Sequence, residues 1–76
     1  MSDDNLIGYP ITKKDSIITD TPNFRIAVGP SGWDENPCIK LAFKDAEGND
    51  YMVHEFHQQE AVMLVKGFLD AFLEYP

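Results

Sequence analysis

Large apolar and polar residues alternate over two stretches of the chain, residues 24–29 and 38–44. Strict alternation is typical of a strand with one buried face, because successive side chains point to opposite faces of a sheet. The residues expected to face the core are Phe24, Ile26, Val28, Ile39, Leu41 and Phe43. The opposite side carries Arg25, Lys40 and Lys44, which we expect to face outward.

Two further strands are predicted, over residues 16–19 and 50–55. The first is a short β-branched run that precedes the turn-forming residues 20–23. The second follows residues 45–49, DAEGN, which fit a three-residue hairpin loop with Gly48 in the left-handed region.

The length of this hairpin loop decides which residues of the last strand face the core. A three-residue loop places Phe43 opposite Tyr51. Tyr51 and Val53 then join the core face, and Met52 and His54 face outward. A four-residue loop would reverse the assignment, because a slip of one residue moves every side chain to the other face.

From residue 57 the apolar spacing changes to the 3.6-residue period of a helix, which we expect to span residues 57–75. Phe56 and Ala61 stand where a hydrophobic staple would fix its start, and Glu60 stands where a capping box places an acid. One side of this helix is apolar: Ala61, Leu64, Val65, Phe68, Phe72 and Tyr75. The predicted fold is therefore α+β, a three- to four-stranded antiparallel β-meander with one C-terminal α-helix packed on one face.

The length of 76 residues limits the chain to one domain with a thin core. We assign residues 15–76 to this domain and residues 1–14 to an N-terminal arm that is partly docked. The first residues lack the basic start and apolar segment of a signal peptide, and no apolar run reaches the roughly 20 residues of a membrane span. Together with the single cysteine, this composition predicts a cytoplasmic protein.

A shoulder of the predicted helix, formed by Val62, Leu69 and Leu73, widens its apolar side to about half of the circumference. One small sheet cannot bury so much surface, so the shoulder needs another cover. Either the N-terminal arm provides it, or the same shoulder of a second chain does so in a two-fold dimer. We favour the homodimer, since Gly8 and Pro10 make the arm irregular.

Residues 39–75 include LAFKDAEGNDYMVHEFHQQEAVMLVKGFLDAF. This segment resembles the C-terminal part of many small bacterial and phage proteins that end in a strand, an EGN hairpin, a strand and an EAxxL helix. The resemblance covers about half of the chain and concerns the fold, without a functional motif. It implies a prophage-type accessory protein and transfers no site residues.

Thirteen acidic residues stand against six basic ones, which gives a net charge of −7. Nucleic-acid-binding proteins draw most of their affinity from cations that meet phosphates, so we expect no direct binding of DNA or RNA. A basic protein is the partner that this charge favours. The alternative is nucleic-acid binding through Arg25, Lys40 and Lys44 on the outer face of the sheet.

Both histidines lie in the sequence HEFH, which places His54 and His57 three residues apart. The zinc signature HExxH spaces its histidines by four residues, so that both imidazoles share one face of a helix. We therefore expect no metal, no cofactor and no catalytic residue. The alternative is a metal-binding or enzymatic protein centred on His54, His57 and Cys38.

Trp33 stands in a polar loop, where it is either folded back over the edge of the core or an interface anchor flanked by Asp34 and Glu35. Asp70 and Glu74 stand in the last turns of the helix, where the macrodipole disfavours acids. Because they break this local rule, they are also candidate contacts. We predict a non-enzymatic interaction module that uses these five residues to bind and modulate another protein, basic or nucleic-acid-handling.

Overall fold

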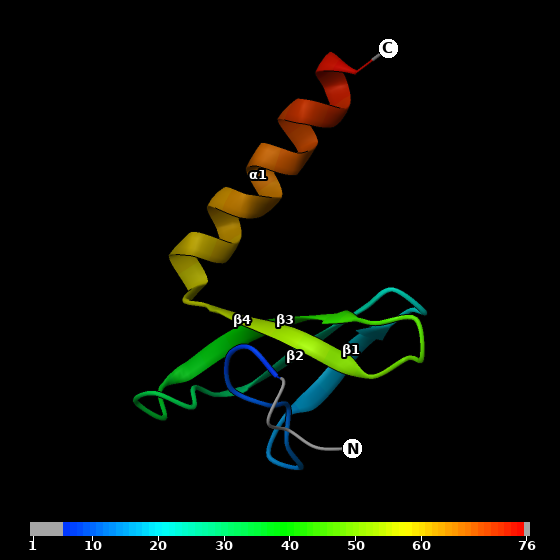
Figure 1. Cartoon of the computed structure of the whole chain (residues 1–76). Coiled ribbons are helices and arrows are strands. Elements are labelled where there is room, and N and C mark those ends of the chain that lie inside the picture. The colour runs from blue at the N-terminus through cyan, green and yellow to red at the C-terminus, as the bar shows by residue number, and fades with distance from the viewer. Residues whose placement is uncertain (1–5, 76) are drawn as a thin grey trace.

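The computed structural model describes residues 6–75, which form one antiparallel sheet followed by one helix (Figure 1). The sheet order is β1-β2-β3-β4, so each strand pairs with its neighbour in sequence. The elements are β1 (Ser16–Asp20), β2 (Phe24–Pro30), β3 (Pro37–Lys44), β4 (Asp50–Phe56) and α1 (Gln58–Glu74). The predicted α+β class, the antiparallel meander and the C-terminal helix are confirmed. Part of the predicted arm, residues 1–5, lies outside the described residues.

The hairpin between β3 and β4 has the predicted turn. The backbone N–H of Asp45 donates to the carbonyl oxygen of Asn49 (2.8 Å), and that of Gly48 donates to the carbonyl oxygen of Asp45 (3.0 Å). Gly48 has a φ of 86°, the left-handed conformation that this type of turn requires at its last position.

A β-bulge at the start of β4 changes the register that the turn predicts. Lys44 pairs with Asp50 but Phe43 pairs with Met52, so Tyr51 is an extra residue in β4. The prediction that Phe43 lies opposite Tyr51 is therefore wrong. The slip of one residue exchanges the two faces of β4 relative to the prediction.

With this register, the two faces of the sheet differ in composition. In β2, β3 and β4 the apolar face consists of Phe24, Ile26, Val28, Ile39, Leu41, Phe43, Met52, His54 and Phe56. The other face, which we name the arm face, carries Arg25, Ala27, Cys38, Lys40, Ala42, Lys44, Val53 and Glu55. Every buried strand residue lies on the arm face, whereas the apolar face is partly exposed. The prediction that the large apolar residues of β2 and β3 face the buried core is therefore wrong.

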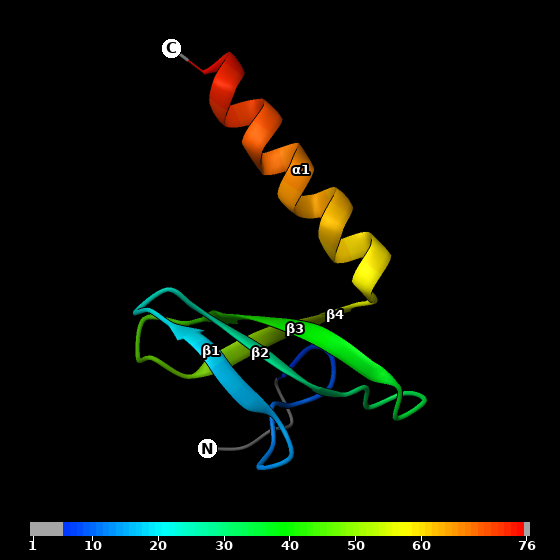
Figure 2. The same ribbon diagram turned by 180° about the vertical axis from the view of Figure 1, so that it is seen from behind.

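Residues 6–14 of the N-terminal arm cover the arm face, as Figures 1 and 2 show from opposite sides. It pairs with the edge of β4: the N–H of Ile7 donates to Tyr51 (3.0 Å), and the N–H of Val53 donates to Ile7 (2.8 Å). Gly8 follows with a φ of 97°, and a Cβ at this position would lie 2.1 Å from the carbonyl oxygen of Val53. Only glycine fits such a close approach. Since the arm and α1 lie on opposite sides of the sheet, the alternative in which the arm covers the helix shoulder is wrong.

A buried lysine ties the arm to the sheet. The Nζ atom of Lys40 lies 3.1 Å from both carboxylate oxygens of Asp15 and 3.9 Å from the carboxylate of Glu55. The side chains of Lys40 and Asp15 are 3% and 0% exposed. Asp15 also accepts a hydrogen bond from the backbone N–H of Thr12 (2.7 Å). A buried ion pair thus joins Asp15, which precedes β1, to Lys40 in the middle of β3.

The other two cations of the arm face are also paired. Arg25 binds Asp50, and this hydrogen bond raises the pKa of the guanidinium. Lys44 binds Asp20 at the end of β1. The prediction that Arg25, Lys40 and Lys44 face outward is therefore wrong, because their face of the sheet is the covered one and each meets a carboxylate.

Helix α1 contacts β3 and β4 at its start and then points away from the sheet (Figures 1 and 2). Ala61 is buried in the first turns, but Phe68 and Phe72 are 65% and 77% exposed. The prediction that the helix packs across one face of the sheet is therefore wrong. A single extended residue, His57, joins β4 to α1, and it provides no loop that would turn the helix back. The predicted cap by Glu60 is confirmed, since its carboxylate accepts the N–H of His57 (3.3 Å).

Replacing Lys40 tests the role of the buried ion pair. We expect Lys40→Met to lower the free energy of unfolding by about 3–5 kcal/mol, because it leaves the carboxylate of Asp15 buried without its cation. Asp15→Asn combined with Lys40→Met removes both charges, so this double variant should be more stable than the sum of the single effects by about 1 kcal/mol or more. Urea unfolding of the four proteins measures this coupling. Additive losses would contradict an energetically coupled pair.

Candidate functional site

Residues 31–36, which we name the Trp33 loop, join β2 to β3 in a closed turn. The N–H of Ser31 donates to the carbonyl oxygen of Asn36 (2.8 Å), and the N–H of Glu35 donates to that of Ser31 (3.0 Å). The carboxylate of Asp34 accepts the N–H of Asn36 (3.0 Å). Glu35 has a φ of 64°, a left-handed conformation in a non-glycine residue that this bonding pattern holds in place.

The carboxylate of Glu55 anchors the Trp33 loop to β4. One of its oxygens accepts the hydroxyl of Ser31 (2.7 Å), and the other accepts the backbone N–H of Gly32 (2.8 Å). The hydroxyl of Ser31 in turn accepts the N–H of Trp33 (3.0 Å). Because Glu55 also lies beside Lys40, the loop is connected to the buried ion pair that holds the arm. The backbone of this loop is therefore fixed before any partner arrives.

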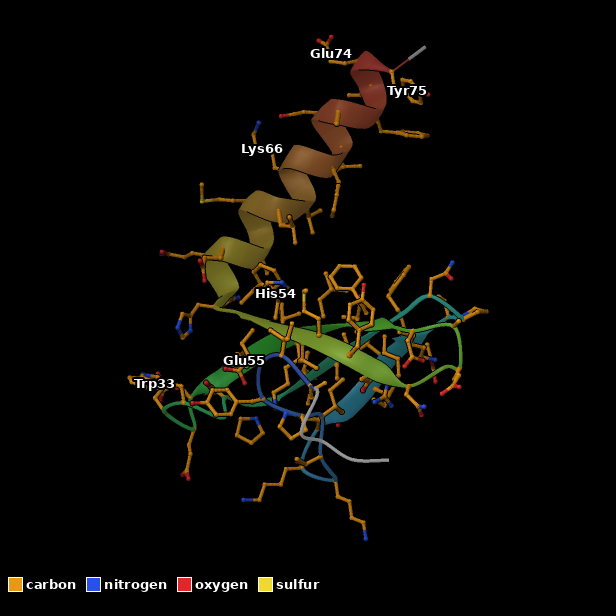
Figure 3. All side chains as sticks on the ribbon, viewed as in Figure 1. Trp33, His54, Glu55, Lys66, Glu74 and Tyr75 are labelled. Carbon is orange, nitrogen blue, oxygen red and sulfur yellow. The ribbon has the colours of Figure 1, made fainter. Side chains whose placement is uncertain are left out.

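The side chain of Trp33 projects from the anchored loop and is 79% exposed. Figure 3 shows it at the end of the sheet, apart from the strands. Of the two predicted positions for this residue, folding over the edge of the core is therefore wrong. A large aromatic side chain that is exposed on a rigid backbone is the usual form of a protein-binding anchor.

The charges beside Trp33 are negative. The pKa of Asp34 is lowered, chiefly because its carboxylate accepts the backbone hydrogen bond of Asn36, so Asp34 is ionised at neutral pH. Glu35 follows it and is also exposed. The loop therefore presents two neighbouring carboxylates and one indole to the surroundings.

The two helix acids predicted as partner contacts lie elsewhere. Asp70 pairs with Lys66 one turn earlier (2.8 Å), so this acid has a structural role that offsets its unfavourable place in the helix. Glu74 lies at the far end of α1 from Trp33 (Figure 3). The structure thus brings Trp33, Asp34 and Glu35 together and leaves Asp70 and Glu74 apart from them.

The candidate metal or catalytic group is not assembled. Cys38 lies on the arm face and His54 on the apolar face, where its ring centroid is 6.4 Å from that of Phe43. His57 is exposed at the start of α1. Within residues 6–75 no three histidine, cysteine or acidic side chains are grouped as metal ligands. The alternative that centres a site on His54, His57 and Cys38 therefore has no support in the geometry.

Sequence reasoning missed Ser31, Glu55 and Tyr9 as residues of this site. A Cβ built on Gly32 would lie 2.3 Å from the ring of Tyr9, so the arm packs directly against the loop. The one sequence signal for these residues was Glu55, because an acid within a predicted strand needs hydrogen-bond donors for its carboxylate if it is buried. Its donors lie 23 and 24 residues earlier, a separation that no local pattern connects.

Comparisons with protein-family models, with curated proteins and with solved structures find no match to this chain. Among residues 6–75, no helix is long and apolar enough to cross a membrane.

The thiol of Cys38 is expected to be unreactive in the folded protein. Burial raises the pKa of this thiol, so a smaller fraction of it is ionised at a given pH. Cys38 is also only 6% exposed, so a reagent has little access to the sulfur. Modification by a disulfide reagent at pH 8 should be about 100-fold slower or more than in urea, because reaction needs an opening of the sheet. The pH at which the reaction reaches half of its plateau should also lie above that of the unfolded chain. Equal rates with and without urea would contradict this burial.

Proposed function

We propose that this protein is a small acidic, non-enzymatic interaction module whose Trp33 loop binds a basic surface of another protein. The observation that carries the proposal is one arrangement: an indole that is 79% exposed, beside two carboxylates, on a loop that Glu55 holds at its start and that a backbone hydrogen bond from Ser31 to Asn36 closes. The resemblance to small phage proteins supports an accessory role, in which binding modulates the activity of the partner. Nucleic-acid-handling proteins are one class with such a basic surface.

The fixed backbone of the Trp33 loop favours binding. Ordering a flexible loop on association costs free energy, and a loop that is already ordered avoids much of that cost. Tryptophan is among the residues whose truncation most weakens interfaces, commonly by about 2 kcal/mol or more. The loop therefore combines the side chain that contributes most to affinity with a backbone that has little freedom to lose.

The charge of the surface favours a cationic partner. Arg25, Lys40, Lys44 and Lys66 each pair with a carboxylate of the same chain, so they do little to offset the remaining acids. A net charge of −7 then attracts a basic surface over a distance, which speeds association at low salt.

Capture of partners from a lysate, with variants compared by quantitative mass spectrometry, tests this proposal. Proteins bound through the loop should be basic, and their capture should fall at least about tenfold with Trp33→Ala. Glu35→Lys should also reduce their capture. Glu47→Lys is the matched control, because it makes the same change of charge in the exposed hairpin at the other end of the sheet.

Salt provides the second readout. Raising the ionic strength from about 0.1 M to about 1 M shortens the screening length from about 10 Å to about 3 Å, so capture through the loop should weaken. A partner that is lost equally with Glu35→Lys and Glu47→Lys would show non-specific attraction to an acidic protein. Partners retained with Trp33→Ala at all salt concentrations would contradict the role of the loop.

A further inference from the structure

Within residues 6–75, two apolar surfaces are exposed. One is the apolar face of the sheet, whose residues are all partly or well exposed. The other is the apolar side of α1, which includes Val65, Phe68 and Phe72, together with the predicted shoulder of Val62, Leu69 and Leu73. Monomeric proteins rarely leave contiguous apolar surface of this extent in water.

The total surface is also too large for a monomer of this size. A folded monomer of 8.6 kDa exposes about 4,700 Å², whereas this chain exposes 6040 Å². Its radius of gyration is 13.4 Å, against about 11 Å for a compact chain of the same length. The excess of about 1,300 Å² corresponds to about 2,600 Å² for a pair of chains, within the range of obligate homodimers.

We propose that a second copy of this chain covers both surfaces in a two-fold dimer, with the helix of each chain lying on the apolar face of the other. This contact uses residues distinct from the Trp33 loop, so it goes beyond the proposed function. Each chain carries both surfaces. The contact between the helix of one chain and the sheet of the other is therefore repeated by the two-fold axis, and all four surfaces of the dimer are buried.

The dimensions of the two surfaces agree. The 17 residues of α1 make a helix of about 25 Å, and the 8 residues of β3 span about 26 Å. The apolar face contains no aspartate, glutamate, lysine or arginine, and His54 is its one ionisable side chain, so the net negative charge of each chain lies outside the contact. Lys66 and Asp70 lie on the opposite side of α1, where they stay in water.

Two alternatives agree less well with the structure. Covering the sheet with the helix of the same chain would require a reversal at His57, the single residue between β4 and α1. A contact between two helices alone would cover the side of α1 and leave the apolar face exposed. The exchanged arrangement covers both without changing the fold of either chain.

Light scattering on the full chain tests the proposal. We expect a mass of about 17 kDa, twice that of one chain, and a dimer that persists in high salt because its contact is apolar. Phe72→Glu should raise the dissociation constant at least about 100-fold. Met63→Glu is the matched control, since Met63 is 72% exposed on the polar side of α1, and this variant should remain dimeric.

Nuclear Overhauser effects in a mixture of labelled and unlabelled chains test the exchange itself. We expect contacts between the ring of Phe72 in one chain and Leu41 or Phe43 in the other. A wild-type mass of 8.6 kDa at millimolar concentration would overturn the dimer, and interchain contacts confined to the two helices would overturn the exchange. Trp33→Ala should leave the mass unchanged, so failure of the dimer and failure of the Trp33 loop as a binding site are distinguishable.

Discussion

The buried amino group of Lys40 is the constraint on which the arrangement of this protein depends. A charge removed from water must be paired, and Lys40 pairs with Asp15, which lies between the arm and β1, and with Glu55 of β4. Asp15 fixes where the arm meets the sheet, and Glu55 binds the first two residues of the Trp33 loop. One lysine in the middle of β3 therefore positions both the N-terminal segment and the candidate binding site.

This constraint also decides which face of the sheet is left open. The residues buried around Lys40 are small, namely Ala27, Cys38, Ala42 and Val53, so the arm can approach the sheet closely. With the arm on that face, the larger apolar residues of β2, β3 and β4 lie on the other. The helix begins on their side but leaves the sheet after its first turns (Figure 1). The protein thus has a closed interior of small residues around a buried ion pair on one side and an open apolar surface on the other.

The sequence was sufficient for the elements and insufficient for their packing. Alternation, turn residues and the change of period predicted every strand and the helix within a few residues. The predicted register of β4 was wrong from Tyr51 onward, because a bulge depends on contacts between strands and has no signature in the local sequence. The prediction of which sheet face is buried was wrong at Lys40, because a lysine in an alternating strand normally faces water. Asp15, the partner that allows Lys40 to be buried, lies 25 residues earlier in the sequence. Trp33, Asp34 and Glu35 are consecutive in the sequence and could be grouped from it, but the residues that hold their loop could not.

Native-state hydrogen exchange on the wild-type protein tests most directly whether the arm, the sheet and the Trp33 loop form one unit around Lys40. The amide of Val53 donates to Ile7 of the arm, and the amide of Gly32 donates to Glu55. If the ion pair unites these parts, both amides should exchange with free energies within about 1 kcal/mol of those in β3. Fast exchange at Val53 and Gly32, with β3 still protected, would show that the arm and the loop open independently and would contradict this account.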